Sequence, residues 1–204
     1  MIIHGVDIKL PTGPAGILCS GGADSSLLLY ILAKYSKHPL HVFTLANHGK
    51  KFSNTTHATQ VVNYVINRTQ RFNIVHHIYY SKEQTEKELS VYPLSFLKHT
   101  IQELYIGDTS YPPDEINKSF AIHGIDKIQD SVDRSYGNTR ETKIGPFVYP
   151  FTNYTKKTIA DFYEKERLQE MFPLTRSCES KDVTDTHCGV CWWCNERRWA
   201  FGRL

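Results

Sequence analysis

The 204-residue sequence has no apolar run that approaches the roughly 20 residues needed to cross a bilayer. It also lacks the charged and apolar regions of an N-terminal signal peptide. No low-complexity tract and no internal repeat occur, which excludes a repeat architecture and extended disorder away from the termini. These absences predict a soluble, cytoplasmic protein with one main domain and no membrane partner.

Long blocks of like charge are absent as well. The chain has 24 lysines and arginines against 21 aspartates and glutamates, which gives a formal net charge of +3. This charge is too small to demand a nucleic-acid partner, although basic residues gather near the C-terminus. Nucleic acid is therefore a less favoured partner than a small molecule.

Two adjacent glycines stand between two apolar stretches near the N-terminus. Residues 19–26, which read CSGGADSS and are called the glycine loop below, follow Ile17-Leu18 and precede the apolar residues 27–32. This order predicts a strand, a tight turn and a helix. Glycines allow close approach to a ligand, and the first turn of a helix offers amide groups that suit phosphate oxygens. The glycine loop is thus a candidate anion site.

The side chains of the glycine loop favour a metal–nucleotide complex over a bare phosphate. Asp24 would repel phosphate unless a magnesium ion lay between them, whereas the neighbouring serines add hydroxyl donors. A tight turn with a serine or aspartate cap is the alternative, and it needs no ligand. No Gly-Lys-Ser/Thr follows, which excludes a Walker A loop and γ-phosphoryl transfer.

The string from Ser20 to Ser25 resembles the signature loop of the ATP pyrophosphatase (PP-loop) superfamily, which cleaves ATP between its α and β phosphates. The resemblance implies that the loop holds the pyrophosphate part of ATP, with Mg²⁺, while a substrate oxygen attacks the α phosphate. The candidate nucleotide contacts are Ser20, Gly21, Gly22, Ala23, Asp24, Ser25, Ser26, Leu45 and Arg176. For Arg176, an exposed surface arginine is the alternative.

Strand and helix patterns alternate along the rest of the chain. Strands are expected at 17–18, 40–46, 72–80, 104–106 and 147–150, and helices after the glycine loop and at 54–68, 81–100 (interrupted near Pro93) and 155–169, with Thr155 as N-cap. This alternation predicts an α/β fold with a parallel five-stranded sheet and helices on both faces. Ligands of such sheets bind beyond the carboxyl ends of the strands.

Several further site residues follow from this arrangement. Lys156, at the start of a predicted helix, is a candidate catalytic group beside Asp24 and Ser25, because its charge could offset that of departing pyrophosphate; a solvated lysine is the alternative. His48 and Asp108 each follow a predicted strand and are candidate acceptor contacts, as is Tyr111. A lone histidine is more often structural.

Four of the five cysteines fall near the C-terminus with the spacing C-x9-C-x2-C-x2-C. They are Cys178, Cys188, Cys191 and Cys194. Four thiolates suit the tetrahedral preference of Zn²⁺ and leave no open position for catalysis, so a structural zinc site is predicted. An iron–sulfur cluster is the main alternative, and a disulfide is disfavoured in a reducing compartment.

The chain is predicted to divide into two parts. Residues 1–170 would form the PP-loop domain, in which the long segment of about 108–145 is a candidate substrate lid. Residues 171–204 would form the zinc-binding segment. There, Trp192 and Trp193 are candidates for stacking on a base or for packing around the metal, and Arg197 is read as positive charge near a helix end.

The glycine loop and the cysteines together resemble the 7-cyano-7-deazaguanine synthase family of the queuosine pathway. The likeness lies in the glycine loop, in residues 150–156 (PFTNYTK), in residues 175–178 (TRSC) and in the CGVCWWC ending with its trailing Arg197 and Phe201. The family's Tyr-Gly-Gln after the second strand is replaced by residues 47–50 (NHGK), and its Arg-Asn pair has no counterpart near residues 92–96. The acceptor is therefore less defined than the ATP chemistry.

The resemblance implies an adenylylating ligase that uses ATP and ammonia on a 7-deazaguanine carboxylic acid. The family makes a nitrile through adenylylated carboxylate and amide intermediates, and it often forms homodimers. A variant that stops at the amide or uses another amine is compatible with the altered residues. The alternatives are a tRNA-thiolating PP-loop enzyme and a non-catalytic, zinc-containing nucleic-acid-binding protein.

Overall fold

The computed structural model describes residues 1–46, 53–80, 92–96, 99–121, 143–144, 147–180 and 185–204. His48 and most of the predicted lid lie outside these residues. None of the described helices is both long and apolar enough to cross a membrane.

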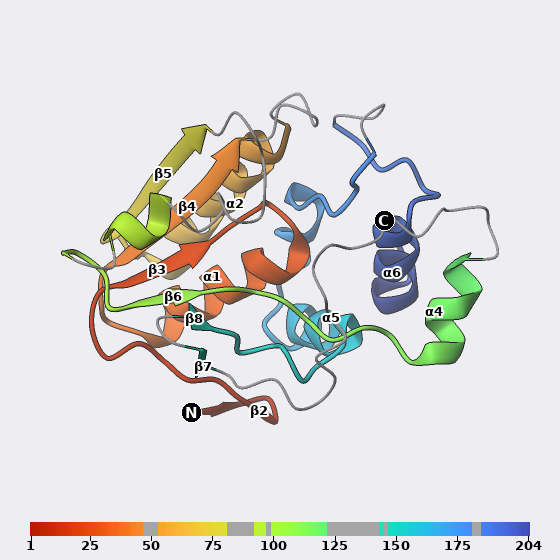
Figure 1. Cartoon of the computed structure of the whole chain (residues 1–204), viewed down its shortest axis with the longest axis horizontal. Helices are drawn as coiled ribbons and strands as arrows, with labels where there is room; N and C mark the ends of the chain where they lie inside the picture. Colours follow the sequence, from red (N-terminus) through yellow and green to blue (C-terminus); the bar gives the residue numbers. More distant parts are fainter. Residues whose placement is uncertain (47–52, 81–91, 97–98, 122–142, 145–146, 181–184) are drawn as a thin grey trace.

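A six-stranded sheet forms the centre of the molecule (Figure 1). Its strand order is β5 (Ile74–Tyr80), β4 (Leu40–Ala46), β3 (Ala15–Leu18), β6 (Glu103–Tyr105), β8 (Phe147–Val148) and β7 (Lys143–Ile144). The first five run parallel, which confirms the predicted α/β fold, and β7 adds an antiparallel edge. The sequence did not predict β7, because a strand of two residues is too short to show an alternating pattern of apolar and polar residues.

Three helices form a layer on one face of this sheet. Helix α1 (Ala23–Tyr35) contacts both α2 (Ser53–Thr69) and α5 (Lys156–Lys165). Almost every side chain of α1 between Ala23 and Ala33 is buried, since the helix is apolar on all sides and lies between the sheet and its neighbours. The helix that follows the glycine loop is thereby packed on several sides by the sheet, α2 and α5.

The two faces of the sheet are covered differently. Val42 and Tyr105 belong to the large core under the three helices, whereas their neighbours Phe43 and Leu104 belong to a smaller cluster on the opposite face. A short helical stretch at residues 92–96 contributes Phe96 to that smaller cluster.

The remaining elements lie at the two ends of the fold. A two-stranded hairpin, β1 (Ile2–Ile3) and β2 (Val6–Asp7), carries the N-terminus. Helices α4 (Asp114–Ala121) and α6 (Trp192–Phe201) contact each other on the side away from β5 (Figure 1). A 3-10 turn, η3 (Phe172–Leu174), leads from α5 toward the cysteine segment.

The helix predicted to run to residue 169 ends earlier. Helix α5 stops at Lys165, and Arg167 takes a left-handed φ of 55°. The Leu168 amide then donates to the Tyr163 carbonyl at 2.8 Å, which turns the fully buried Leu168 side chain back to the core. Burial of Leu168 therefore decides the helix end, against a sequence pattern that would allow another turn.

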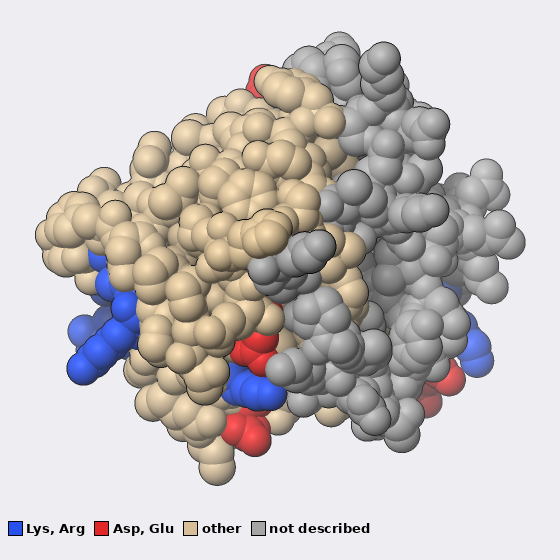
Figure 2. All heavy atoms as spheres, turned by 60° about the vertical axis from the view of Figure 1, so that its left-hand side comes forward, with Lys and Arg blue, Asp and Glu red and all other residues tan. Residues whose placement is uncertain are grey.

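Strand β5 is one edge of the sheet and carries little charge. Its sequence, IVHHIYY, exposes Val75, Ile78 and Tyr80. Figure 2 shows this side of the molecule, where the described surface is mostly uncharged and most of the few charged side chains in view lie on its lower part. The homodimer suggested by the family resemblance stays a prediction.

A buried carboxylate, Glu166, joins the end of α5 to the N-terminal hairpin and to α1. It accepts hydrogen bonds from His4 at 2.8 Å, Tyr35 at 2.9 Å and Tyr30 at 3.2 Å, and it pairs with Lys34. Burial alone would raise the pKa of Glu166, but the hydrogen bonds from Lys34, His4 and Tyr35 outweigh it and lower the pKa from 4.5 to about 2.

Glu166→Gln is expected to lower the free energy of unfolding by about 2 kcal/mol at pH 7, because it removes the charge that these donors share. A lowered folded-state pKa stabilises the fold above pH 4.5, and this contribution is lost as the pH falls toward about 2. Denaturant unfolding at several pH values should therefore show the two proteins converging in acid. The exposed Glu164→Gln on the same helix is the control. A difference that does not change with pH would contradict the assignment.

Candidate active site

The glycine loop lies where β3 meets α1, and Gly21 fixes its shape. Gly21 has a φ of +81°, which disfavours any residue with a Cβ. A Cβ on Gly21 would also lie 2.9 Å from the backbone nitrogen of Ala58 and 2.9 Å from the Cβ of His57, both on α2. Gly22 then caps α1 in an extended conformation, without a side-chain cap. The predicted turn therefore packs directly against α2.

The serines of the loop differ in their contacts. The Ser25 hydroxyl lies 3.3 Å from the Gly22 carbonyl oxygen, to which it donates, and 3.3 Å from the Ser20 amide, which donates to it. The Ser26 hydroxyl is buried and has no hydrogen-bond partner within the described residues. Ser25 thus holds the turn closed, in addition to being a predicted catalytic group.

The turn after β6 lies so close to the loop that a side chain at Gly107 would collide with the loop backbone. A Cβ on Gly107 would lie 2.9 Å from both the nitrogen and the Cα of Ser25. The next residue, Asp108, is half-buried, and the Thr109 hydroxyl is buried without a hydrogen-bond partner in the described part of the chain. The predicted acceptor contact Asp108 is therefore brought to the glycine loop by a glycine whose role the sequence analysis missed.

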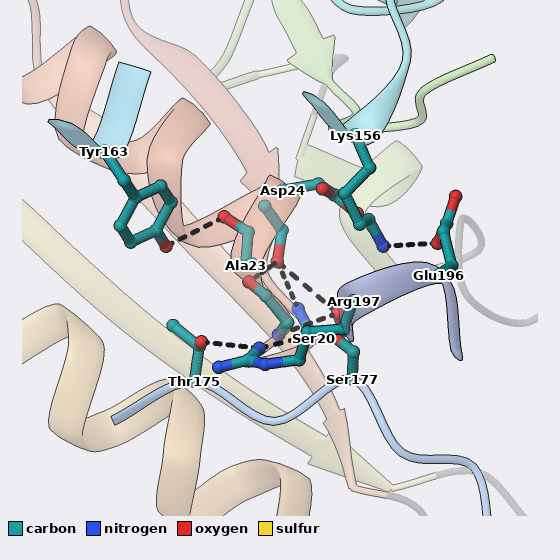
Figure 3. Close-up of polar contacts among 11 residues, drawn as sticks. Ser20, Ala23, Asp24, Lys156, Tyr163, Thr175, Ser177, Glu196 and Arg197 are labelled. Carbon is teal, nitrogen blue, oxygen red and sulfur yellow. Dashed lines mark hydrogen bonds and ion pairs between the residues drawn. The ribbon is translucent and has the colours of Figure 1, made fainter. Parts of the chain in front are cut away.

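Lys156 and Asp24 form an ion pair beside the loop. Lys156 Nζ lies 3.0 Å from Asp24 Oδ2 and 2.7 Å from Glu196 Oε2 (Figure 3). The Lys156 side chain is only 3% exposed, which overturns the alternative of a solvated lysine. The other oxygen of Asp24, Oδ1, is buried and accepts no hydrogen bond from any described residue.

Two arginines of the C-terminal segment are buried near the loop. The Arg176 backbone amide donates to the Gly21 carbonyl at 2.8 Å, and its guanidinium Nε donates to the Thr186 carbonyl at 2.9 Å. The expected alternative of an exposed arginine is wrong, since Arg176 is 7% exposed. Its contact to the loop is made by the backbone.

The reading of Arg197 as mere charge near a helix end is also wrong. Its side chain is fully buried and donates to Thr175 Oγ1 at 2.9 Å and to the Phe172 carbonyl at 3.0 Å, and it stacks on the Phe172 ring. Burial lowers the pKa of Arg197 to about 10, so it stays charged at neutral pH. Arg197 lies in a run of polar residues, and this pattern does not predict that its side chain is buried.

The buried side chains of Arg176 and Arg197 place positive charge near the loop. Burial, with the charges of Arg197 and Arg176, lowers the pKa of His187 to about 4, so its ring is neutral at pH 7. On the other side of α1, the Tyr163 hydroxyl donates to the Ala23 carbonyl at 3.0 Å (Figure 3). Contacts from the C-terminal segment and from α5 thus hold the loop at Gly21 and at Ala23.

Other predicted site residues lie farther along the same edge. Leu45 is the next-to-last residue of strand β4, and its carbonyl accepts a hydrogen bond from Asn54 of α2 at 2.6 Å. Tyr111 packs edge-on against Trp192 with 5.7 Å between ring centroids. The Trp192 ring nitrogen donates to Asn117 at 2.8 Å, so this tryptophan joins α4 to α6.

The four cysteines of the C-terminal segment converge on one point. The Sγ atoms of Cys178, Cys188, Cys191 and Cys194 all lie within 4.8 Å of one another. The Sγ atoms are 3.9 Å apart in the pairs Cys188–Cys194 and Cys178–Cys191, near the roughly 3.8 Å edge of a tetrahedron with zinc–sulfur bonds of about 2.3 Å.

The charge state of the cluster suits a metal cation. A hydrogen bond with Cys194 lowers the pKa of Cys191 to about 4, so the cluster holds a thiolate at neutral pH. The Cys188 amide donates to Cys178 Sγ at 3.4 Å, and the Cys191 amide donates to Cys188 Sγ at 3.3 Å. The cluster could therefore bind zinc.

The comparisons with known proteins agree with this arrangement. Residues 11–94 match the asparagine synthase family model, which spans the glycine loop and strands β3 to β5. The structure is similar to that of NMN synthetase from Francisella tularensis, with a TM-score of 0.51 and 12% sequence identity over 93% of this chain and 77% of that one. No curated protein matches the sequence. The two matches support the PP-loop superfamily relationship predicted from the glycine loop.

Gly21→Ala tests the fit of the loop against α2. The control is Gly202→Ala, because Gly202 also has a positive φ, of +71°, but nothing lies within 4 Å of its added Cβ. Denaturant unfolding should show a loss of about 1 kcal/mol for the control, from backbone strain alone. We expect Gly21→Ala to cost about 2 kcal/mol more, because the methyl group meets the backbone of α2. Equal costs would show that the loop does not pack as described.

Proposed function

We propose that the protein is an ATP-dependent carbon–nitrogen ligase that splits ATP between the α and β phosphates and releases AMP and pyrophosphate. The observation that carries the proposal is the glycine loop at the carboxyl end of a parallel sheet, with Asp24 and the buried Lys156 beside it. A strand, a glycine turn and a helix N-terminus at this edge are suited to phosphate groups.

The residues at the loop fit a magnesium–nucleotide complex. Asp24 Oδ1 is buried without a hydrogen-bond partner among the described residues, and carboxylate oxygens are ligands that magnesium prefers. Asp24 would hold the ion, which supplies charge neutralisation for the phosphates when bound. Gly21 and Gly22 would let the backbone approach the nucleotide.

The chain's own residues would then act on the leaving pyrophosphate. Lys156 has a fixed position because two carboxylates hold its ammonium group, and its charge would offset the negative charge that develops as the α–β bond breaks. The Ser25 hydroxyl would keep the turn closed around the phosphates. Arg176 would act through its backbone, which holds Gly21 in place.

The proposed acceptor is a 7-deazaguanine carboxylic acid, with ammonia as the nucleophile. Support comes from the sequence likeness of residues 150–156 and of the cysteine segment, and from Asp108 lying next to the loop. Cys19 lies outside the metal cluster and is buried, and burial raises its pKa. A thiolation reaction that needs an accessible thiolate is therefore disfavoured.

The test is an assay with magnesium-ATP, ammonia and 7-carboxy-7-deazaguanine. The proposal predicts AMP and pyrophosphate in equal amounts and an amide or nitrile of the acid by mass spectrometry. Formation of ADP and phosphate would overturn the mechanism. AMP release with no change in the acid would retain the mechanism and reject the acceptor.

Asp24→Asn is expected to reduce AMP release about a hundredfold or more, because the amide cannot hold the metal or balance Lys156. Asp161→Asn, an exposed change on α5, is the matched control and should keep full activity. Both variants should unfold at a temperature close to that of the wild type. An Asp24→Asn protein that turns over at the normal rate would place the active site elsewhere.

A further inference from the structure

The side chain of Ser177 is a buried hydroxyl group that keeps its own hydrogen for a further partner. Ser177 is 9% exposed and lies directly before Cys178, the first cysteine of the cluster. Nη1 of Arg197 donates to Ser177 Oγ at 3.3 Å (Figure 3). Among the described residues, the Ser177 hydroxyl makes no other hydrogen bond. A hydroxyl that only accepts still has one hydrogen to donate.

The neighbouring Thr175 has the same donor but uses its hydroxyl fully. Nη1 of Arg197 also donates to Thr175 Oγ1, at 2.9 Å, and Thr175 Oγ1 in turn donates to the Phe172 carbonyl at 2.7 Å. The arginine therefore orients two hydroxyls, and of these two Ser177 is the one that can still donate. Accepting from a charged guanidinium also polarises a hydroxyl, which makes it a stronger donor.

The Ser177 hydroxyl lies beside the start of α1. A Cβ on Gly22, the N-cap of this helix, would lie 3.4 Å from Ser20 Oγ and 4.0 Å from Ser177 Oγ. The third neighbour of that point is the Arg176 carbonyl oxygen at 3.8 Å, which cannot donate. Ser20 and Ser177 are therefore the nearest side-chain donors on this side of Gly22, next to helix amide groups that suit phosphate oxygens.

We infer that Ser177 is a further nucleotide contact, whose hydroxyl donates a hydrogen bond to a phosphate oxygen in the pyrophosphate part of ATP while Arg197 holds it in place. This inference rests on the proposed function at the glycine loop. It adds to that loop a donor from a segment more than 150 residues away in the sequence. The C-terminal segment would then contact the nucleotide itself as well as support the loop.

A purely structural role is the competing explanation, in which Ser177 only accepts the hydrogen bond from Arg197. Thr175 separates the two roles, because it accepts a shorter hydrogen bond from the same nitrogen and has no hydrogen left for a ligand. If the bond to Arg197 were all that mattered, loss of the Thr175 hydroxyl would harm nucleotide binding at least as much as loss of the Ser177 hydroxyl.

The experiment compares Ser177→Ala with Thr175→Val by calorimetric titration with α,β-methylene-ATP, which cannot be split between its α and β phosphates, at saturating magnesium. Ser177→Ala is expected to weaken binding about tenfold or more, the loss typical of one hydrogen bond to a charged group. Thr175→Val should bind within about twofold of the wild type. In denaturant unfolding the order should reverse, because Thr175→Val removes two buried hydrogen bonds and Ser177→Ala removes one.

The outcomes separate this inference from the proposed function. If wild-type protein binds the analogue and Ser177→Ala binds it equally well, the phosphate contact is overturned and the proposed function stands. If Thr175→Val loses as much affinity as Ser177→Ala or more, the role of Ser177 is structural and the inference is likewise overturned. If wild-type protein does not bind the analogue, both the proposed function and the inference fail.

Discussion

The buried ammonium group of Lys156 is the point on which the site depends. A charge in the interior is stable only when opposite charges accompany it. Here one of those charges comes from the glycine loop, through Asp24, and the other comes from α6, through Glu196. Lys156 itself begins α5, so three segments that are far apart in the sequence meet at one atom. The loop, the helix beneath the sheet and the C-terminal helix therefore cannot move independently without breaking an ion pair.

The C-terminal segment holds the glycine loop and the residues beside it, and so forms part of the proposed nucleotide site. The Arg176 amide holds the Gly21 carbonyl, Glu196 holds Lys156, and Arg197 ties α6 to Thr175 and Phe172. The cysteine cluster, from Cys178 to Cys194, lies in the sequence between Arg176 on one side and Glu196 and Arg197 on the other. A bound metal would fix α6 and the residues after η3 relative to each other, because its four ligands come from both. A structural metal could in this way support catalysis at a distance without contacting the substrate.

The sequence allowed the local features to be predicted but not their long-range partners. The glycine loop and the thiol cluster could be predicted because paired glycines, a following aspartate and closely spaced cysteines have specific local chemistry. The parallel fold could be predicted from the alternation of strand and helix patterns. Glu196 and Arg197 look like an ordinary polar pair on a short helix, and only the fold shows that both point inward. Gly107 directly follows the predicted strand at 104–106 and has no local motif around it, yet its lack of a side chain is what lets the turn after β6 reach Ser25. The roles of these residues depend on which distant segment of the chain packs against them, and a local sequence pattern does not predict that segment.

The most direct test of the account is to load the purified protein with zinc, to remove the metal again with a chelator, and to follow hydrogen–deuterium exchange by mass spectrometry before and after removal. If the C-terminal segment holds the nucleotide site, peptides covering residues 19–26 should exchange faster once the metal is gone, together with those covering residues 175–178 and α6. Peptides from β4 and β5, which pair with each other along the sheet, should keep their protection. Unchanged exchange in residues 19–26 after complete metal loss would contradict the account, because the loop would then be stable without the segment.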